Sequence, residues 1–349
     1  MQRSVGAMLT THVGSLPRPD DLVELLYARE NADDGGSVPD GLRARVRAAV
    51  ADSVRQQVET GLDVVNDGEM SKVSYSTYVS ARLTGFDSHV QVQRYPRADA
   101  AAFPRYAEWN ARQQQGAARI KRYACTGPVR YVGQAELQAD LDNLRAALAD
   151  APDREAFMTA ASPGVIAWFQ PNQYYASDAD YLAALAEAMR EEYTAIVNAG
   201  FVLQLDCPDV ALSWNVPSSA SVAPIGLRIE ALNTAVRSIP ADRMRLHLCW
   251  GNYEGPHETD VPLVKILGDV LLARPQAISF EGANPRHEHE YAVFGEVQLP
   301  SDKVIIPGVL DTTTNYIEHP ELVAQRLVRY AELVGPERVI AGADCGFGT

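Results

Sequence analysis

Short apolar runs alternate with longer amphipathic stretches along the chain. The runs are rich in β-branched and aliphatic residues and predict eight strands, at 8–14, 62–69, 120–128, 201–208, 244–251, 276–283, 303–311 and 338–346. The stretches between them predict helices, most clearly at 20–30, 42–61, 178–200, 226–239 and 320–335. Eight strands that alternate with helices indicate an α/β protein, a single (β/α)8 TIM barrel. An open doubly wound sheet is the alternative, but no GxGxxG motif follows an early strand.

Two segments interrupt this alternation. Residues 87–119 are polar and rich in Gln, Arg and Ala, which predicts an insertion after strand 2. Residues 162–177 predict an aromatic loop after strand 3; the AWFQ within it could form a ninth strand, but the neighbouring Pro and Asn favour a loop. We expect one domain over 1–349. Thr349 follows the eighth predicted strand directly, so either the sequence lacks the last barrel helix or the strand count is off by one; if the helix is lacking, we expect a further segment or a partner chain in its place.

Composition and charge limit the classes of function. Hydrophobic residues make up 46% and charged residues 22% of the chain, as in ordinary soluble globular proteins. No apolar run approaches the ~20 residues of a membrane span, and the N-terminus lacks a secretory signal, so we expect a cytoplasmic protein without a membrane partner. The net charge of −14 argues against a nucleic-acid partner. The composition leaves the oligomeric state open, a homo-oligomer included.

Cysteine and histidine mark a candidate metal site. The four cysteines lie far apart in a chain without an export signal, which favours metal binding, catalysis or burial over disulfides. His247 and Cys249 are two apart on a predicted strand, so their side chains point the same way. Glu281 and Cys345 end later strands, and a barrel brings such ends together. Two thiolates, an imidazole and a carboxylate favour zinc.

Each of these residues also has a simpler interpretation. An HxC pair alone is a weak zinc motif, and Cys125 and Cys207 are more simply small buried apolar residues. The HEHE run at 287–290 is typical of a solvated loop, and His257 of a surface turn. The aromatic residues of the 162–177 segment are typical either of a substrate lid or of ordinary packing: Trp168, Phe169, Tyr174 and Tyr175.

A set of short motifs spans the chain from Thr10 to Cys345. They are TTHVGSLPRP, NDGE, TGPV, LQLDCP, HLCWGN, ISFEG, PGVLD and ADCG. In this order they resemble the C-terminal catalytic barrel of the cobalamin-independent methionine synthase family. The chain looks most like the single-barrel members, which include core methionine synthases and zinc-dependent epoxyalkane:coenzyme M transferases.

The resemblance implies a catalytic zinc and a thiol substrate. The ligands of the zinc would be His247, Cys249, Glu281 and Cys345, in agreement with the positions of these residues at predicted strand ends. In the family a substrate thiol binds zinc as a thiolate and attacks an alkyl carbon. Zinc makes this effective because a free thiol, with a pKa near ~8.5, is mostly protonated at neutral pH. Glu281 is a catalytic candidate as the ligand that leaves when the thiol arrives.

The resemblance also implies contacts to homocysteine. Backbone groups at Gly14 and Ser15 would hold its carboxylate, with His12 beside them at the same strand end. Glu69 and Asp206 would hold its ammonium group, which makes Asp206 a catalytic as well as a binding candidate; a strand-end cap or a buried pair with Arg is its simpler role.

Three departures from the family concern the alkyl donor. RYVGQ follows TGPV where the synthase has a folate-stacking Trp–Ser–Phe segment, Thr313 stands where it has a proton-donating His, and Cys207 replaces a Glu. These differences leave the donor open between methyltetrahydrofolate, a methyl corrinoid protein, another methylated small molecule and an epoxide.

The leading hypothesis is therefore a zinc-dependent S-methyltransferase, with homocysteine as acceptor. An epoxyalkane:coenzyme M transferase or carbon–sulfur lyase is the alternative, in which a sulfonate would need a cation; Arg18 and Lys72 are the candidates, or they are solvated surface charges. A non-enzymatic zinc- or thiol-binding protein is the third reading. Structural zinc sites usually lack a carboxylate ligand, and Glu281 argues against it.

Overall fold

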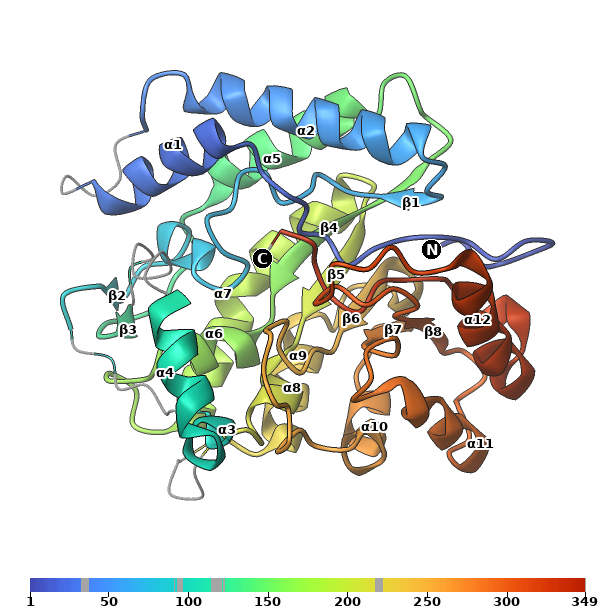
Figure 1. Cartoon of the computed structure of the whole chain (residues 1–349). Helices are drawn as coiled ribbons and strands as arrows, with labels where there is room; N and C mark the ends of the chain where they lie inside the picture. Colours follow the sequence, from blue (N-terminus) through green and yellow to red (C-terminus); the bar gives the residue numbers. More distant parts are fainter. Residues whose placement is uncertain are drawn as a thin grey trace.

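A parallel six-stranded sheet forms the centre of the structure, a computed structural model that describes residues 1–32, 38–90, 92, 97–113, 121, 123–216 and 222–348. The sheet curls through the middle of the molecule, with helices around its outer side (Figure 1). Its strand order is β1-β4-β5-β6-β7-β8, and every neighbouring pair is parallel. The strands are β1 (Val64–Val65), β4 (Glu155–Ala161), β5 (Val202–Asp206), β6 (Met244–His247), β7 (Ala277–Phe280) and β8 (Val304–Pro307).

Helices connect the strands, as expected for an α/β fold. The five helices predicted most clearly are confirmed, each within a few residues of the predicted ends: α1 (Asp20–Asn31), α2 (Leu42–Glu59), α7 (Asp178–Asn198), α9 (Ile225–Ala235) and α12 (Pro320–Val334). The other α-helices described are α3 (Ala98–Ala102), α4 (Pro104–Gln113), α5 (Gln134–Ala147), α6 (Pro163–Phe169), α8 (Asp209–Leu212), α10 (Leu263–Leu271) and α11 (Val293–Glu296). Short 3-10 turns lie at η1 (Tyr78–Ala81), η3 (Ala241–Arg243), η4 (Glu288–Ala292) and η5 (Pro336–Arg338).

Two extended segments lie between the edge strands of this sheet. The amide of Val64 donates to the Thr10 carbonyl at 3.0 Å, and the amide of Thr11 donates to the Ala341 carbonyl at 2.8 Å. On the other side, the amide of Ile340 donates to the Ile305 carbonyl at 3.0 Å. Residues 9–11 and 339–342 therefore bridge β1 to β8, at the places where the sequence predicts its first and eighth strands.

The register of the strands places their inward-facing side chains in layers. Asp206 pairs with His247, and His247 with Ser279, at the carboxyl ends of β5, β6 and β7. One layer deeper, Thr159 pairs with Gln204, and Gln204 with Arg245. Two small apolar clusters are also buried among the strands: Val64, Phe157 and Val202, and Ala277, Val304, Ile306 and Ile340. Polar side chains therefore collect at the carboxyl ends, where barrel enzymes place their chemistry.

The third strand of the sheet is not the one that the sequence predicts. Among the described residues of the predicted strand 120–128, only β3 (Ala124–Cys125) forms, and it pairs antiparallel with β2 (Phe86–Asp87) outside the main sheet. The strand between β1 and β5 is β4, whose sequence EAFMTAA is not among the predicted strands. Ala, Met and Glu are good helix formers, and only Phe157 and Thr159 favour a strand, so local preference hid an element that burial on both faces stabilises.

The two predicted interruptions are also revised. The prediction of a loop at 162–177 is wrong over its first half, because α6 forms there with Ser162 as its N-cap and Pro163 in its first turn. The predicted insertion 87–119 contains α3 and α4, and its residues 91, 93–96 and 114–119 lie outside the described part of the chain. Among the described residues, no helix is long and apolar enough to cross a membrane.

Candidate metal centre and thiol pocket

Three of the four predicted metal ligands meet at the carboxyl end of the sheet. His247 ends β6, Cys249 follows two residues later, and Cys345 comes from the segment after 339–342. One potential ligand atom from each lies within 4.8 Å of the others, and the two sulfurs are 3.5 Å apart. Two thiolates on one tetrahedral zinc lie about 3.8 Å apart, as follows from Zn–S bonds of about 2.3 Å. The cluster therefore has the dimensions of a zinc site.

The imidazole of His247 is oriented for metal binding. Its Nδ1 lies 3.3 Å from the Ser279 hydroxyl, while its Nε2 is buried without a hydrogen-bond partner. Burial, with Arg245 nearby, lowers the pKa of His247 to about 3, so the ring is neutral. A buried ring nitrogen with a free lone pair is costly unless a ligand uses it. A hydrogen bond that fixes the other ring nitrogen, as the Ser279 hydroxyl makes here, is typical of metal-binding histidines.

The close approach of the two thiols favours the binding of a cation between them. The Cys345 thiol beside it, together with burial, raises the pKa of Cys249 well above its usual value. The amide of Gly251 points at the Cys249 sulfur over 3.2 Å. Without a positive charge nearby the Cys249 sulfur would stay protonated, and a divalent cation would favour its thiolate. The donor set thus fits a soft divalent metal.

Glu281 lies beside this cluster and is held by two hydrogen bonds. Its Oε1 accepts from the Trp250 amide at 2.7 Å, and its Oε2 accepts from the Asn284 side chain at 2.9 Å. Burial, with Cys249 and Asp344 nearby, raises the pKa of Glu281 well above its usual value. Glu281 is not one of the three residues whose ligand atoms cluster within 4.8 Å.

Asp344 ties the Cys345 segment to the loop that carries Glu281. Its carboxylate accepts from the amides of Gly282, Ala283 and Asn284, each at 2.8 Å, and from the Asn284 side chain at 2.9 Å. Two loops from different strands therefore share one anchor, which fixes Cys345 relative to Glu281. Only the ADCG motif could have indicated this role from the sequence.

Two buried carboxylates face each other near the metal cluster. Asp206 ends β5 and pairs in register with His247, while Glu69 follows β1 and lies near enough to raise the pKa of Asp206. Burial first, and then the Glu69 charge, raise that pKa to about 7. The Gln204 side chain donates to Asp206 Oδ1 at 2.8 Å. Two acids in one buried pocket favour a cationic ligand between them.

Gly14 approaches this pair so closely that no larger residue fits. Its φ is +141°, and a Cβ there would lie 2.7 Å from Thr159 Cγ2 and 2.9 Å from Glu69 Oε1. Glu69 itself has a φ of +56°, uncommon for a residue with a side chain. Strained backbone of this kind persists where the surroundings over-determine it, and it often lies at ligand sites.

The other predicted substrate residues support these loops. His12 accepts the Gly14 amide at Nδ1 (3.2 Å) and pairs with Gln57 through Nε2 (2.8 Å). Ser15 accepts the Phe347 amide at its carbonyl oxygen (2.8 Å), which joins the first and last segments. Arg18 donates twice to the Glu69 carbonyl oxygen, at 3.0 and 3.1 Å.

Lys72 and Thr159 complete the pocket wall. The Lys72 ammonium donates to the Thr159 carbonyl oxygen at 2.5 Å and to the Thr159 hydroxyl at 2.8 Å. Thr159 was missed by sequence reasoning because the strand that carries it was missed. Ser279 was missed as well, although its place two residues before Glu281 could have indicated an inward side chain.

The prediction of a solvated loop at the HEHE run is wrong for two of its residues. His287 and Glu290 of the HEHE run are buried rather than solvated: His287 bonds Glu290 at 2.7 Å and Asp260 at 3.2 Å, and its ring packs on Trp250. His257 is half-buried and bonds the same Asp260 at 2.7 Å. Although burial opposes it, the hydrogen bonds that His287 donates to the carboxylates of Asp260 and Glu290 raise its pKa to about 9. Trp250, next to Cys249, thus packs against a buried charged network of His287, Asp260 and Glu290.

The TGPV motif does not end the third strand of the main sheet. Thr126 and its neighbours follow β3, which lies outside that sheet. The residues that follow the third strand of the sheet are 162–169, and they end in Trp168 and Phe169. Phe169 packs edge-on against Tyr75, with ring centroids 5.9 Å apart. The segment that follows the third strand of the sheet therefore carries an aromatic contact.

The remaining predicted features lie near their expected places. Cys125 and Cys207 are free, buried thiols, as their simpler interpretation predicts. Tyr175 stacks on Tyr181, and its hydroxyl accepts the Val129 amide, so this ring is packed rather than free to act as a lid. Thr313 bonds to Asp311 in the loop after β8.

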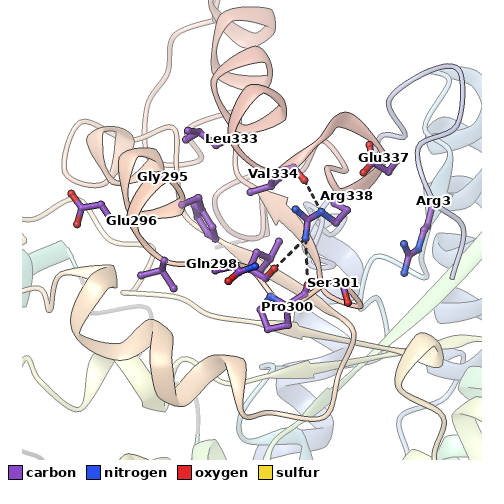
Figure 2. A pocket seen from close by; sticks show the side chains of 13 residues that line it. Arg3, Gly295, Glu296, Gln298, Pro300, Ser301, Leu333, Val334, Glu337 and Arg338 are labelled. Carbon is purple, nitrogen blue, oxygen red and sulfur yellow. Dashed lines mark hydrogen bonds between the residues drawn. The ribbon is translucent and has the colours of Figure 1, made fainter.

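A surface hollow of about 730 Å³ lies elsewhere (Figure 2). It is lined by parts of α11, the 297–301 loop and η5, which precede β8 and the 339–342 segment. It therefore opens at the amino ends of the strands, away from the metal cluster. Its Arg338 is committed to the carbonyl oxygens of Val334, Leu299 and Pro300.

The fold and site together define a class of protein: a parallel α/β protein with a His–Cys–Cys group that could hold a metal ion, beside a pair of buried carboxylates. No family model matches the chain. Among curated proteins it is similar to the methionine synthase of Thermococcus kodakarensis, with 24% identity over 97% of this chain and 86% of that protein. It is equally similar to the methionine synthase of Sulfolobus acidocaldarius, with 25% identity over 99% of this chain and 87% of that protein.

Solved structures agree with this fold. A B12-independent methionine synthase from Shewanella superposes with a TM-score of 0.71, at 19% identity, over 98% of this chain and 92% of that one. A putative B12-independent methionine synthase from Listeria monocytogenes gives 0.67, at 20% identity, over 98% and 93%. The resemblance of the motifs to the cobalamin-independent methionine synthase family is thus confirmed along nearly the whole chain.

Proposed function

We propose that this protein is a zinc-dependent S-methyltransferase that methylates homocysteine. The observation that carries the proposal is the position of the Glu69–Asp206 pair beside a metal cluster whose ligand His247 pairs in register with Asp206. Homologues over nearly the full chain are named methionine synthases, which supports methyl transfer to this thiol. We further infer that residues 9–11 and 339–342 complete an eight-stranded (β/α)8 ring within one domain of 1–349.

Zinc would be held by His247 Nε2, the sulfurs of Cys249 and Cys345, and a carboxylate oxygen of Glu281. The unpartnered Nε2 and the sulfur spacing of 3.5 Å support this assignment. Glu281 would be the ligand that leaves, because its oxygens already have the Trp250 amide and the Asn284 side chain as alternative partners. When bound, the metal supplies a positive charge that lowers the pKa of a thiol at neutral pH.

The protein's own residues would bind and orient the substrate. Glu69 and Asp206 hold the ammonium group, and the main chain at Gly14 and Ser15 receives the carboxylate. The homocysteine sulfur loses its proton to solvent and forms a bond to the methyl carbon; the bond between methyl and donor breaks, its electron pair stays with the donor, and a proton from solvent neutralises the donor anion. Burial of both carboxylates excludes water and strengthens their attraction for the amino group.

The donor would approach from the side of Tyr75 and Phe169. Burial, with Cys249, Cys345 and Asp206 nearby, raises the pKa of the Tyr75 phenol, which supports a position over the cluster. An aromatic wall suits a donor with a flat ring, and methyltetrahydrofolate is such a donor; a corrinoid or another methylated molecule remains the alternative.

The coenzyme M alternative finds less support. It needs a cation for the sulfonate, and its two candidates donate to protein oxygens: Arg18 to the Glu69 carbonyl and Lys72 to Thr159. The described pocket offers carboxylates to a substrate. A purely structural zinc site is also less consistent with a carboxylate at Glu281.

A competition between thiols tests the proposal. Zinc-loaded protein is incubated with homocysteine, coenzyme M or cysteine, and binding is measured by calorimetry. Under the proposal homocysteine binds with the highest affinity, and with methyltetrahydrofolate present it is converted to methionine. Preferential binding of coenzyme M would contradict the assignment of the amino group to Glu69 and Asp206.

A further inference from the structure

Thr159 occupies a central position in the thiol pocket. It is fully buried on β4, and its side chain contacts three elements of the site. Its hydroxyl lies 2.9 Å from Glu69 Oε1 and 2.8 Å from Lys72 Nζ, and its methyl group lies directly under Gly14.

The chemistry of these groups fixes the direction of both hydrogen bonds. An ammonium group only donates, so the Thr159 hydroxyl must accept from Lys72. Its one proton is then left for Glu69 Oε1, which must accept it. Among the described residues no hydrogen bond reaches Glu69 Oε2, so this oxygen is the one available to a ligand.

Lys72 is itself held in place from several sides. Its ammonium also donates to the Thr159 carbonyl at 2.5 Å and lies 4.6 Å from the centre of the Tyr78 ring. The Tyr78 hydroxyl donates to the buried carboxylate of Glu192 at 2.6 Å. With only about 2% of its surface exposed, Lys72 is a fixed donor and not a mobile surface charge.

We propose that Thr159, oriented by Lys72, is a positioning residue that determines specificity for the amino group of the thiol substrate. It pins Oε1 of Glu69 and turns Oε2 toward the space shared with Asp206. The inference rests on the proposed function, because it assumes that this carboxylate pair binds the ammonium group. It assigns Lys72 to the protein's own hydrogen-bond network and not to a substrate anion.

Two substitutions at this position separate shape from hydrogen bonding. Thr159→Val keeps the size and removes the hydroxyl, whereas Thr159→Ser keeps the hydroxyl and removes the methyl group. Each zinc-loaded variant is titrated with homocysteine and with 4-sulfanylbutanoate, which is homocysteine without its amino group. Loss of a hydrogen bond to a charged group predicts an approximately tenfold weaker Kd for homocysteine in Thr159→Val. The affinity for 4-sulfanylbutanoate, and kcat at saturating homocysteine, should change by less than about twofold, and Thr159→Ser should restore homocysteine binding.

A double-mutant cycle with Glu69→Gln tests whether Thr159 affects homocysteine binding through Glu69. If Thr159 acts through Glu69, Thr159→Val should add little to the loss caused by Glu69→Gln alone. Equal weakening of both thiols by Thr159→Val, or full additivity with Glu69→Gln, would overturn the proposal. Should Thr159→Val fail to fold, Lys72→Met is the substitute, because it frees the Thr159 hydroxyl to rotate. It should weaken the binding of homocysteine but not of 4-sulfanylbutanoate; an unchanged Kd for homocysteine would contradict the role of Lys72 in orienting Thr159.

The result for the unaltered protein separates this inference from the proposed function. If it does not distinguish homocysteine from 4-sulfanylbutanoate, the amino-group site itself is wrong and both ideas fall. If it prefers homocysteine and Thr159→Val keeps that preference, only the role of Thr159 is refuted.

Discussion

Replacement of Asp206 by Asn should weaken homocysteine binding and remove its pH dependence. The carboxylate is buried at the end of β5, and its pKa is raised to about 7 by burial and by Glu69. Near neutral pH a proton therefore competes with the substrate's ammonium group for this site. As the pH falls below 7, the Kd for homocysteine should rise by up to about tenfold per pH unit.

The expected magnitude follows from the two carboxylates. Removal of one partner of a buried charge pair costs about 2–5 kcal/mol. Glu69 remains as a second anion, so the lower part of this range applies, and Asp206→Asn should weaken the Kd by about 30- to 150-fold at pH 8. The free protein should respond in the opposite sense: because the pKa of Asp206 is raised on folding, its ionisation costs stability above pH 7, and this cost is relieved as the pH falls toward the ordinary value of 3.8.

The assay compares two thiols so that effects on the metal and the sulfur cancel. The Kd ratio of 4-sulfanylbutanoate to homocysteine is measured from pH 5.5 to pH 8.5 with zinc-loaded protein. In the unaltered protein the ratio should fall below pH 7, and in Asp206→Asn it should be small and flat. Asp52→Asn, an exposed change on α2, is the control for net charge. A pH-independent ratio in the unaltered protein, or the same slope in Asp206→Asn, would refute the reasoning.

Three further substitutions probe the pocket and the metal centre. Gly14→Ala would press its Cβ against Thr159 and Glu69 at a φ of +141°, so we expect a stability loss of about 1–3 kcal/mol in chemical denaturation and weak homocysteine binding. Asp344→Ala leaves four donors without their acceptor and should cost at least about 3 kcal/mol, with lower zinc content; unchanged stability would contradict the anchor. Cys345→Ser should lose zinc and activity together, and full zinc retention by atomic absorption would show that Cys345 is not a ligand.

The metal cluster could be predicted from the sequence because its signals are local or lie at strand ends. His247 and Cys249 sit two apart in a strongly apolar run, and this period alone places both on one face. Cys345 follows a similar run near the end of the chain. The helices were likewise predictable, since α2, α7 and α12 carry long apolar stripes at helical spacing.

The pocket wall could not be predicted in the same way. β4 consists largely of helix-forming residues and becomes a strand only because neighbours on both sides supply hydrogen bonds and burial. With β4 missed, Thr159 was missed, and the donor comparison was attached to a segment outside the main sheet. The buried contacts of His287 with Asp260 and Glu290 were also unpredictable, because HEHE alone is as typical of a solvated loop as of a charged network.

Zinc content, followed by X-ray absorption at the zinc edge with and without homocysteine, tests the central claim most directly. We expect about one zinc per chain with two sulfur neighbours, and a third sulfur when homocysteine is added, with an oxygen neighbour lost as Glu281 leaves. A protein that binds no zinc, or a zinc whose neighbours do not change when homocysteine is bound, would contradict thiol activation at His247, Cys249 and Cys345.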